Sequence, residues 1–470
     1  MNFKRLYIIY SFLILSFLNL VLFLYTGEKV LLTNLACILI YILIFRNNGF
    51  RLLSPISFFI FGSLVYYNIS TYLNYLLPQP AIRYDYIGYA EDSIYILLIF
   101  LIFFYLGSLL FSLFSYYRRS HFLEVNFSSS KVNIFLIISF FSLFLFYTFL
   151  SIRFGFFFSG VTAEYNPTIS NFSWLFLFYQ CGVLSMCFLI FKTNQQESYS
   201  LSRISLFIFF LIIFLYFGFI SGKREQLFSS LLFISFVYLF SNRITIFKFI
   251  IITIGISFST LSIGLIGLYR PYALNVIVAT SFEDRLNAFF TVLDYTGLSI
   301  FNLFVMFVDR ISMFYPAGII YEKVPSTYNF IGYSDYLSML SLLLPSFLRT
   351  NNYNAVHKAA VHAQELDIGY AAKMAGSEPL MLIGDLFLRS GMTSVMVFGF
   401  IIGLIITFYD YILREINLKV IAVLSLITHD LIILQSMPIA KAMQFLTRDI
   451  IIFITFIFLI DYFYRKTFLK

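Results

Sequence analysis

Apolar runs long enough to cross a lipid bilayer follow one another along most of this chain, with brief polar turns between them. A transmembrane helix needs about 20 predominantly apolar residues. Hydrophobic residues make up 60% of the 470 residues and charged residues only 11%, whereas roughly 25% of the residues in a soluble domain are charged. The sequence therefore predicts an all-α polytopic membrane protein, with residues 1–470 forming a single integral membrane domain.

The apolar runs predict about twelve transmembrane helices. The first follows the basic start MNFKR and has no small-residue cleavage site after it, so we expect it to stay as a span. The predicted spans cover residues 6–25, 30–46, 52–77, 93–115, 133–152, 171–192, 203–221, 225–241, 244–268, 379–408, 419–436 and 445–464.

Lys and Arg are concentrated in the turns on one side of these spans, as at Arg46, Arg51 and Arg119. By the positive-inside rule this side is cytoplasmic. We therefore expect a multi-pass protein of the cytoplasmic (inner) membrane with both termini in the cytoplasm. Topology also accounts for the net charge of +8, so the charge does not indicate a nucleic-acid partner. The three cysteines, Cys37, Cys181 and Cys187, lie inside apolar runs, and we interpret them as small buried side chains.

One long break in hydrophobicity, residues 269–378, lies on the outer side of the membrane in this topology. Loops beyond about 12 to 15 residues are uncommon unless they are functional or disordered, so we expect the chemistry here. Within this loop, residues 286–308 are apolar at helical spacing and predict a helix lying in the membrane interface. Residues 336–348 predict a re-entrant or interfacial segment.

Several short motifs follow one another in the second half of the chain. They are GKRE at 222–225, Tyr269-Arg270, Asp309-Arg310-Ile311, LLPSFLR at 343–349, SEP at 377–379 before a Gly-rich span, and Thr447-Arg448-Asp449. In this order they resemble the Wzy-type polymerases of O-antigen and related polysaccharides, close in pattern to the enterobacterial common antigen polymerases. The Arg-x10-Gly pattern of some members is absent, because Arg285 is followed by Gly297, one residue further on.

The resemblance implies an enzyme that transfers a growing glycan from undecaprenyl diphosphate onto a new lipid-linked repeat unit at the outer face of the membrane. It implies no cofactor. The partners that it implies are undecaprenyl-diphosphate-linked oligosaccharide, membrane lipid, and the chain-length regulator and flippase of the same pathway.

A departing lipid diphosphate is stabilised by cations near the membrane surface, and the guanidinium fork of Arg matches phosphate oxygens. The alternative is that such cations hold lipid head groups or pair with neighbouring carboxylates. The candidates for diphosphate or substrate binding are Lys223, Arg224, Arg270, Arg285, Arg310 and Arg389.

An acceptor hydroxyl loses its proton as it attacks, which calls for a base. Glu378 is the first candidate, since SEP lies where the long loop re-enters the membrane. Its alternative role is a helix-start carboxylate. His362 is the second candidate, by analogy with related O-antigen ligases. Asp385 and Arg389 are spaced i, i+4, and we expect them to pair in the wall of a cavity.

A metal site is not predicted. His357, His362 and Glu365 do not have HExxH spacing, and the sequence offers no obvious further ligand for a site that needs three or four.

Three other functions stay open at this point. An O-antigen ligase would share the arginines and the external loop. A lipid-linked oligosaccharide flippase or other transporter also has about twelve spans, but transporters usually show paired halves, whereas this long loop is off-centre and has no counterpart. A third reading is a structural partner in a polysaccharide assembly complex.

Overall fold

The computed structural model is built from helices, and the ranges that it describes contain no β-strand. Those ranges are residues 3–48, 51, 53–76, 87–117, 134–154, 176–195, 201–221, 224–241, 261, 264–265, 282–295, 300–312, 314–333, 380–413, 424, 427–428, 430–437, 439–444 and 446. For these residues the prediction of an all-α protein is confirmed.

The chain divides into two compact units, and each is described separately below. Unit 1 comprises Met1–Val125, Ile311–Glu415 and Asp430–Lys470, and unit 2 comprises Asn126–Arg310 and Ile416–His429. That the whole chain forms one membrane domain stays a prediction.

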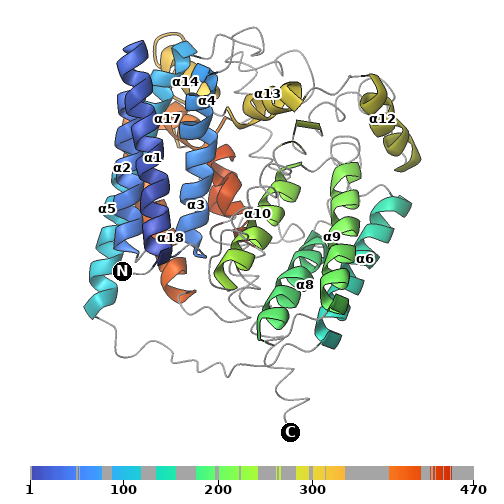
Figure 1. Cartoon of the computed structure of the whole chain (residues 1–470). Helices are drawn as coiled ribbons and strands as arrows, with labels where there is room; N and C mark the ends of the chain where they lie inside the picture. The colour runs from blue at the N-terminus through green and yellow to red at the C-terminus, as the bar shows by residue number, and fades with distance from the viewer. Residues whose placement is uncertain are drawn as a thin grey trace. The chain divides into compact units, whose positions relative to one another are not determined.

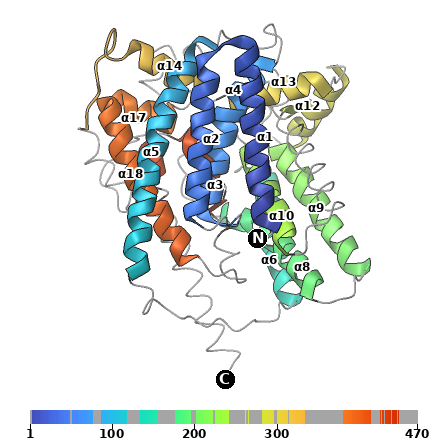
Figure 2. The ribbon, with the colours of Figure 1, turned by 60° about the vertical axis from the view of Figure 1, so that its left-hand side comes forward.

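Unit 1 is a bundle in which helices from the first quarter of the chain pack against helices from the last quarter. In Figures 1 and 2, α2 runs between α1 and α5, and α18 lies along α5. The elements of this unit are α1 (Phe3–Thr26), α2 (Lys29–Asn47), α3 (Pro55–Ser63), the π-helical turn η1 (Leu64–Ile69), α4 (Ser70–Leu76), α5 (Ile87–Tyr117), α14 (Phe314–Lys323), α17 (Leu382–Ser390), α18 (Met392–Ile412), the 3₁₀ turn η6 (Leu434–Ser436) and α20 (Ile439–Gln444).

The most extensive helix contact in unit 1 joins α5 to α18, and glycines make it possible. Gly399 and Gly403 are four residues apart on α18, and their Cα atoms face the backbone of Phe100 and Phe104 on α5. From the other side, Gly107 of α5 approaches Phe400. Small residues at this spacing let two helix backbones come close in a membrane, where dispersion contacts replace the hydrophobic effect as the driving force.

The segment Pro55–Leu76 forms the interior of unit 1, because more of it is buried than of any other long apolar helix described. It begins with Pro55 in the first turn, and the Ser54 hydroxyl accepts a hydrogen bond from the Ser57 N–H at 3.2 Å. This is a standard N-terminal cap. In its middle, η1 inserts one π-helical turn, a distortion often found at functional positions in helices.

Unit 2 has a bundle of its own. Its helices are α6 (Ile134–Phe154), α8 (Phe176–Gln195), α9 (Leu201–Ser221), α10 (Arg224–Ser241), α12 (Phe282–Tyr295) and α13 (Ile300–Ile311). Aromatic rings fill the contact between α6, α8 and α9. Phe144 lies 6.1 Å from Tyr179 and 5.6 Å from Phe214, measured between ring centroids. Many of the chain's Phe and Tyr side chains thus serve helix packing.

Four of the described helices are long and apolar enough to cross a membrane, namely Lys29–Asn47, Pro55–Leu76, Tyr89–Phe114 and Met392–Ile412. Large apolar side chains also point outward from the bundle helices. Phe17 on α1 is 65% exposed, Phe149 on α6 is 62% exposed and Ile212 on α9 is 59% exposed. A surface of this kind suits lipid contact rather than water. The chain is therefore a membrane protein with apolar helices, as predicted.

The structure differs from one of the predicted spans. The run 379–408 is not one helix, because Gly391 (φ 64°, ψ −149°) separates α17 from α18 in a conformation that favours glycine. The helix predicted over 286–308 coincides in part with α12 and α13. Residues 296–299 between them lie outside the described ranges, so a single interfacial helix stays a prediction.

Several predicted segments lie partly or wholly outside the described residues. They are the spans 244–268, 419–436 and 445–464 and the re-entrant segment 336–348.

Candidate functional site

A buried pair of opposite charges, Asp385 and Arg389, lies within α17. Arg389 Nε is 3.3 Å from Asp385 Oδ1. Asp385 is 0% exposed and Arg389 is 5% exposed. Asp385 lies in the first turn of α17 and Arg389 in its last turn, and the helix dipole favours this placement of a negative and a positive charge. The predicted i, i+4 pair is therefore present, and it is buried.

Two further contacts tie this pair to other parts of unit 1. Asp385 Oδ2 accepts a hydrogen bond of 2.8 Å from the backbone N–H of Ile439, the first residue of α20. Arg389 Nη1 donates to the carbonyl oxygen of Gly332 at 3.4 Å. Buried charges need such additional bonds, since their mutual attraction alone rarely repays the loss of water.

The sequence of α17 explains why this helix is buried. Gly384 lets α17 approach α14, and a Cβ added there would lie 3.3 Å from the Cα of Ala317. Three residues later, the Phe387 ring packs against Tyr321 of α14 at a centroid distance of 5.0 Å. Asp385 and Arg389 are therefore surrounded by protein. A buried charge is stable there only when it is paired and hydrogen-bonded.

The other candidate residues are only partly described. Arg224 is the first residue of α10, Arg285 lies in α12 and Arg310 lies in α13; the backbone of each is described, but the side chain is not. The remaining candidates, Lys223, Arg270, His362 and Glu378, lie outside the described residues. Arg389 belongs to unit 1, whereas Arg224, Arg285 and Arg310 belong to unit 2. Their convergence on one substrate stays a prediction.

Arg389 itself is engaged by Asp385 and by the Gly332 carbonyl. The Arg389 guanidinium is therefore held by protein groups, whereas its place in the wall of a cavity and its binding of substrate stay predictions. Among the described residues, no group of three or more His, Cys, Asp or Glu side chains is placed to hold a metal ion. His357, His362 and Glu365 lie outside the described ranges. The three cysteines are free and buried, as predicted.

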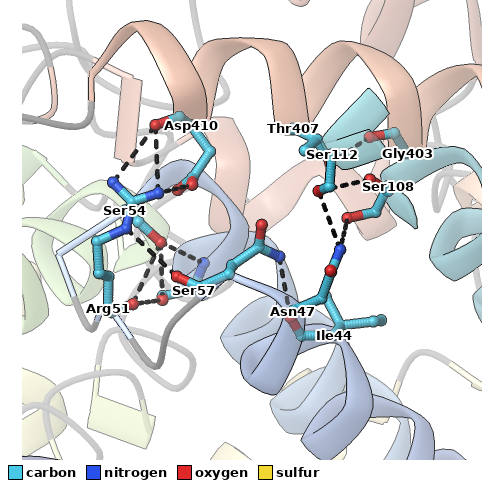
Figure 3. A network of polar contacts seen from close by, with 11 residues as sticks. Ile44, Asn47, Arg51, Ser54, Ser57, Ser108, Ser112, Gly403, Thr407 and Asp410 are labelled. Carbon is cyan, nitrogen blue, oxygen red and sulfur yellow. Dashed lines mark hydrogen bonds and ion pairs between the residues drawn. The ribbon is translucent and has the colours of Figure 1, made fainter. Parts of the chain in front are cut away.

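A second ion pair, between the buried Asp410 and the partly exposed Arg51, was not predicted from the sequence. Figure 3 shows the Arg51 guanidinium directed at the Asp410 carboxylate near the end of α18. The Arg51 side chain also donates to the backbone carbonyl of Asp410 at 3.4 Å. The backbone carbonyl of Arg51 in turn accepts hydrogen bonds from the Ser54 and Ser57 hydroxyls. The turn between α2 and α3 is thereby fixed to α18.

Beside it, Asn47 at the end of α2 donates to Ser112 of α5 at 3.1 Å (Figure 3). In the predicted topology this end of unit 1 is cytoplasmic. The charge distribution indicates only that Arg51 is cytoplasmic; the sequence signal for its partner is the acidic Asp410 at the end of an apolar run.

A third polar cluster crosses the interior of unit 1, and it too was not predicted from the sequence. Asn34 on α2 donates to Asn19 Oδ1 on α1 at 2.9 Å, and Tyr41 donates to Asn68 Oδ1 in η1 at 2.8 Å. Asn68 Nδ2 donates to Asn34 Oδ1 and completes the connection. Hydrogen bonds between helices of this kind hold membrane bundles together. The sequence signal was Asn within apolar runs, one in each of the predicted spans 6–25 and 30–46 and two in 52–77.

No protein-family model matches this sequence, and comparisons with curated proteins and with solved structures likewise return no match. A functional assignment therefore depends on the residues and their arrangement.

Proposed function

We propose that this protein is a polysaccharide polymerase of the Wzy type, a membrane glycosyltransferase that joins undecaprenyl-diphosphate-linked repeat units at the outer face of the cytoplasmic membrane. The observation that carries the proposal is the buried Asp385–Arg389 pair in α17, directly after the SEP motif. Ionisable residues inside a membrane bundle are costly and usually serve function. This pair is placed where the long polar stretch 269–378 returns to apolar helices.

The proposed topology has about twelve spans, with both termini in the cytoplasm. It puts residues 269–378 outside the cell membrane, where lipid-linked repeat units are assembled into polymer. The described apolar helices support membrane insertion. The charge distribution in the turns supports the orientation.

In the proposed reaction, a hydroxyl at the non-reducing end of a single repeat unit attacks the anomeric carbon of the growing glycan. The bond from that carbon to the diphosphate breaks, and undecaprenyl diphosphate leaves with the bonding electrons. Glu378 takes the hydroxyl proton, with His362 as the second candidate. Lys223, Arg224, Arg270, Arg285 and Arg310 are the cations proposed to stabilise the departing diphosphate.

The test is the length of the surface polysaccharide in cells whose native gene has been deleted. Complementation uses the wild type, Arg224→Ala, Arg270→Ala or Glu378→Ala, with membrane levels of each protein measured in parallel. Arg203→Ala, at the predicted cytoplasmic side, is the matched control. We expect deletion to leave one repeat unit on the surface, the three variants to do the same at normal abundance, and the control to restore long chains.

Two other outcomes would replace the proposal. Long polymer that accumulates on the lipid carrier after deletion identifies a ligase. Single lipid-linked repeat units trapped at the inner face identify a flippase. Full activity of all three variants at normal abundance would remove these residues from the site.

A further inference from the structure

The asparagine cluster inside unit 1 satisfies its own side-chain oxygens. Asn19 Oδ1 accepts a hydrogen bond from Asn34, and Asn34 Oδ1 accepts one from Asn68. Asn68 Oδ1 in turn accepts from the Tyr41 hydroxyl at 2.8 Å. The proton of the Tyr41 hydroxyl is thereby committed to Asn68, whereas the lone pairs of its oxygen stay available as acceptors.

Beyond Tyr41 the polar contacts continue into the C-terminal part of the unit. Gln435 Nε2 donates to the Ser63 hydroxyl at 2.6 Å, and this hydroxyl donates to the carbonyl oxygen of Phe59 at 3.2 Å. The Tyr41 hydroxyl also interacts with the side chains of Ser63 and Tyr67. Four polar side chains, from α2, α3, η1 and η6, therefore gather around the π-helical turn. We call this group, Tyr41, Ser63, Tyr67 and Gln435, the Tyr67 cluster.

Two atoms of the Tyr67 cluster have no hydrogen-bond partner in the part of the chain that the structure describes. They are the hydroxyl oxygen of Tyr67 and Oε1 of Gln435. Both side chains are 0% exposed. A buried polar group without a hydrogen bond is strongly unfavourable, and almost all such groups in proteins are satisfied by protein or by ordered water. These two atoms therefore point to a bound partner of small size.

The chemistry of the two atoms defines that partner. The Tyr67 hydroxyl needs an acceptor for its proton, whereas Gln435 Oε1 can only accept. A molecule that accepts from Tyr67 and donates to Gln435 has a second proton left, for which the Tyr41 oxygen is an acceptor. Water does all three, and about three hydrogen bonds are usual for a buried water. A cation cannot accept the Tyr67 proton, and hard cations take about six oxygen ligands.

The backbone around the Tyr67 cluster is irregular on both sides. Tyr67 lies in the π-helical turn η1, and Gln435 lies in the 3₁₀ turn η6, which is followed by the extended residue Met437. In membrane proteins, non-helical backbone occurs where protein surrounds it or where it lines water. Turns of the π type are frequent at functional positions in helices. A bound water agrees with both observations.

We propose that unit 1 binds an ordered water molecule between Tyr67, Gln435 and Tyr41, and that this water joins η1 in the first quarter of the chain to η6 in the last. The inference concerns residues that take no part in the proposed polymerase reaction. It therefore stands or falls independently of that function.

The first experiment detects the water in the purified full-length protein in lipid nanodiscs. Hydroxyl radicals made by radiolysis oxidise a buried ring only where water is bound beside it, and mass spectrometry locates the oxidised residue. Phe59 is the control, because it is also 0% exposed and stacks on Phe104 at a centroid distance of 4.7 Å. With each rate divided by that of the denatured protein, we expect Tyr67 to be oxidised several times faster than Phe59. Equal protection of the two rings would overturn the proposal.

The second experiment uses the sign of a stability change. If the Tyr67 hydroxyl binds water, Tyr67→Phe removes a hydrogen bond, and we expect the folded-to-unfolded ratio to fall about five- to thirtyfold. If the hydroxyl has no partner, its removal relieves a buried polar group, and the variant should be as stable as the wild type or more stable. That second result would contradict the bound water. Tyr25 is 88% exposed, so Tyr25→Phe is the matched control and should change nothing.

A double-mutant cycle with Gln435→Met tests whether one water serves both side chains. Tyr67→Phe should then lower stability less in the Gln435→Met background than in the wild type, whereas strict additivity would overturn the shared water. Unfolding in sodium chloride and in choline chloride at equal ionic strength distinguishes water from a cation. We expect the same Tm in both salts. A Tm raised by sodium in the wild type but not in Tyr67→Phe would replace the water by a cation.

Discussion

The close contact between α5 and α18 allows a sharp test of the packing, with Gly403→Leu as the perturbation. A Cβ added to Gly403 would lie 2.9 Å from the Cα of Phe104 and would overlap that residue's carbonyl group. At Gly399 the added Cβ would lie 2.8 Å from the Phe100 carbonyl oxygen. These neighbours are backbone atoms of a helix, so they cannot rotate away as a side chain can. The two helices would have to separate.

The expected change in the free energy of unfolding follows from two opposing effects. Replacing Gly by Ala in a helix favours the helix by about 0.5–1 kcal/mol. Overpacking a tight contact costs about 1–3 kcal/mol and sometimes more. Because the clash here is with backbone, we expect Gly403→Ala to lower the free energy of unfolding by about 1–2 kcal/mol. Gly403→Leu should lower it by more than about 3 kcal/mol, since a larger side chain also breaks neighbouring contacts.

The assay is reversible unfolding of the purified protein in mixed micelles of increasing denaturing detergent, with the apparent Tm as a second readout. Val397, on the same helix, is 49% exposed, so Val397→Leu adds bulk on an open face and is the control expected to have no effect. A Gly403→Leu protein as stable as the control would refute the reasoning, because it would mean that α5 and α18 do not pack through these glycines.

Three other predictions concern unit 1 and the topology. Asp410→Asn is expected to cost about 1–3 kcal/mol of unfolding free energy, because it removes the carboxylate that pairs with the Arg51 guanidinium; combining it with Arg51→Gln should restore part of this in a double-mutant cycle, and strict additivity would contradict the pairing. Asn68→Leu removes the acceptor of the Tyr41 hydroxyl and the side-chain donor to Asn34 Oδ1, and should cost about 1–3 kcal/mol; added Tyr41→Phe should recover some of this, and no recovery would argue against the Tyr41 hydrogen bond. A green fluorescent protein fused after Lys470 should fluoresce and an alkaline phosphatase fused there should be inactive, whereas the reverse would place the C-terminus outside.

The interior of unit 1 explains why its polar residues are tolerated. Asn34, Asn68 and Gln435 are buried among apolar side chains, and each has at least one hydrogen bond to another helix or turn of the unit. The Gln435 amide, in the 3₁₀ turn η6, donates to the Ser63 hydroxyl of α3 at 2.6 Å. Irregular backbone such as η6 is stable in a membrane protein only where protein surrounds it. These contacts give the interior a defined arrangement that apolar packing alone would specify less tightly.

Helix content, membrane character and the Asp385–Arg389 pair could all be predicted from the residues. The bilayer offers no partner for a backbone N–H or C=O group, so an apolar run of sufficient length has little choice but a helix. The Asp385–Arg389 pair was predictable for a similar reason, since the i, i+4 spacing brings two side chains together on any helix. The break at Gly391 was missed, because glycine is common inside membrane helices and carries no unique signal for a left-handed turn.

The contacts between distant residues required the folded structure. Arg51 and Asp410 are 359 residues apart, and neither apolar periodicity nor charge distribution indicates that they meet. The same holds for the bonds from Ile331 and Gly332 to the end of α17. Periodicity reports which face of a helix is apolar, but helix faces in a membrane are apolar nearly all round. Which faces meet depends on where small residues let backbones approach and where buried polar groups find partners, and both depend on the shape of the assembled bundle.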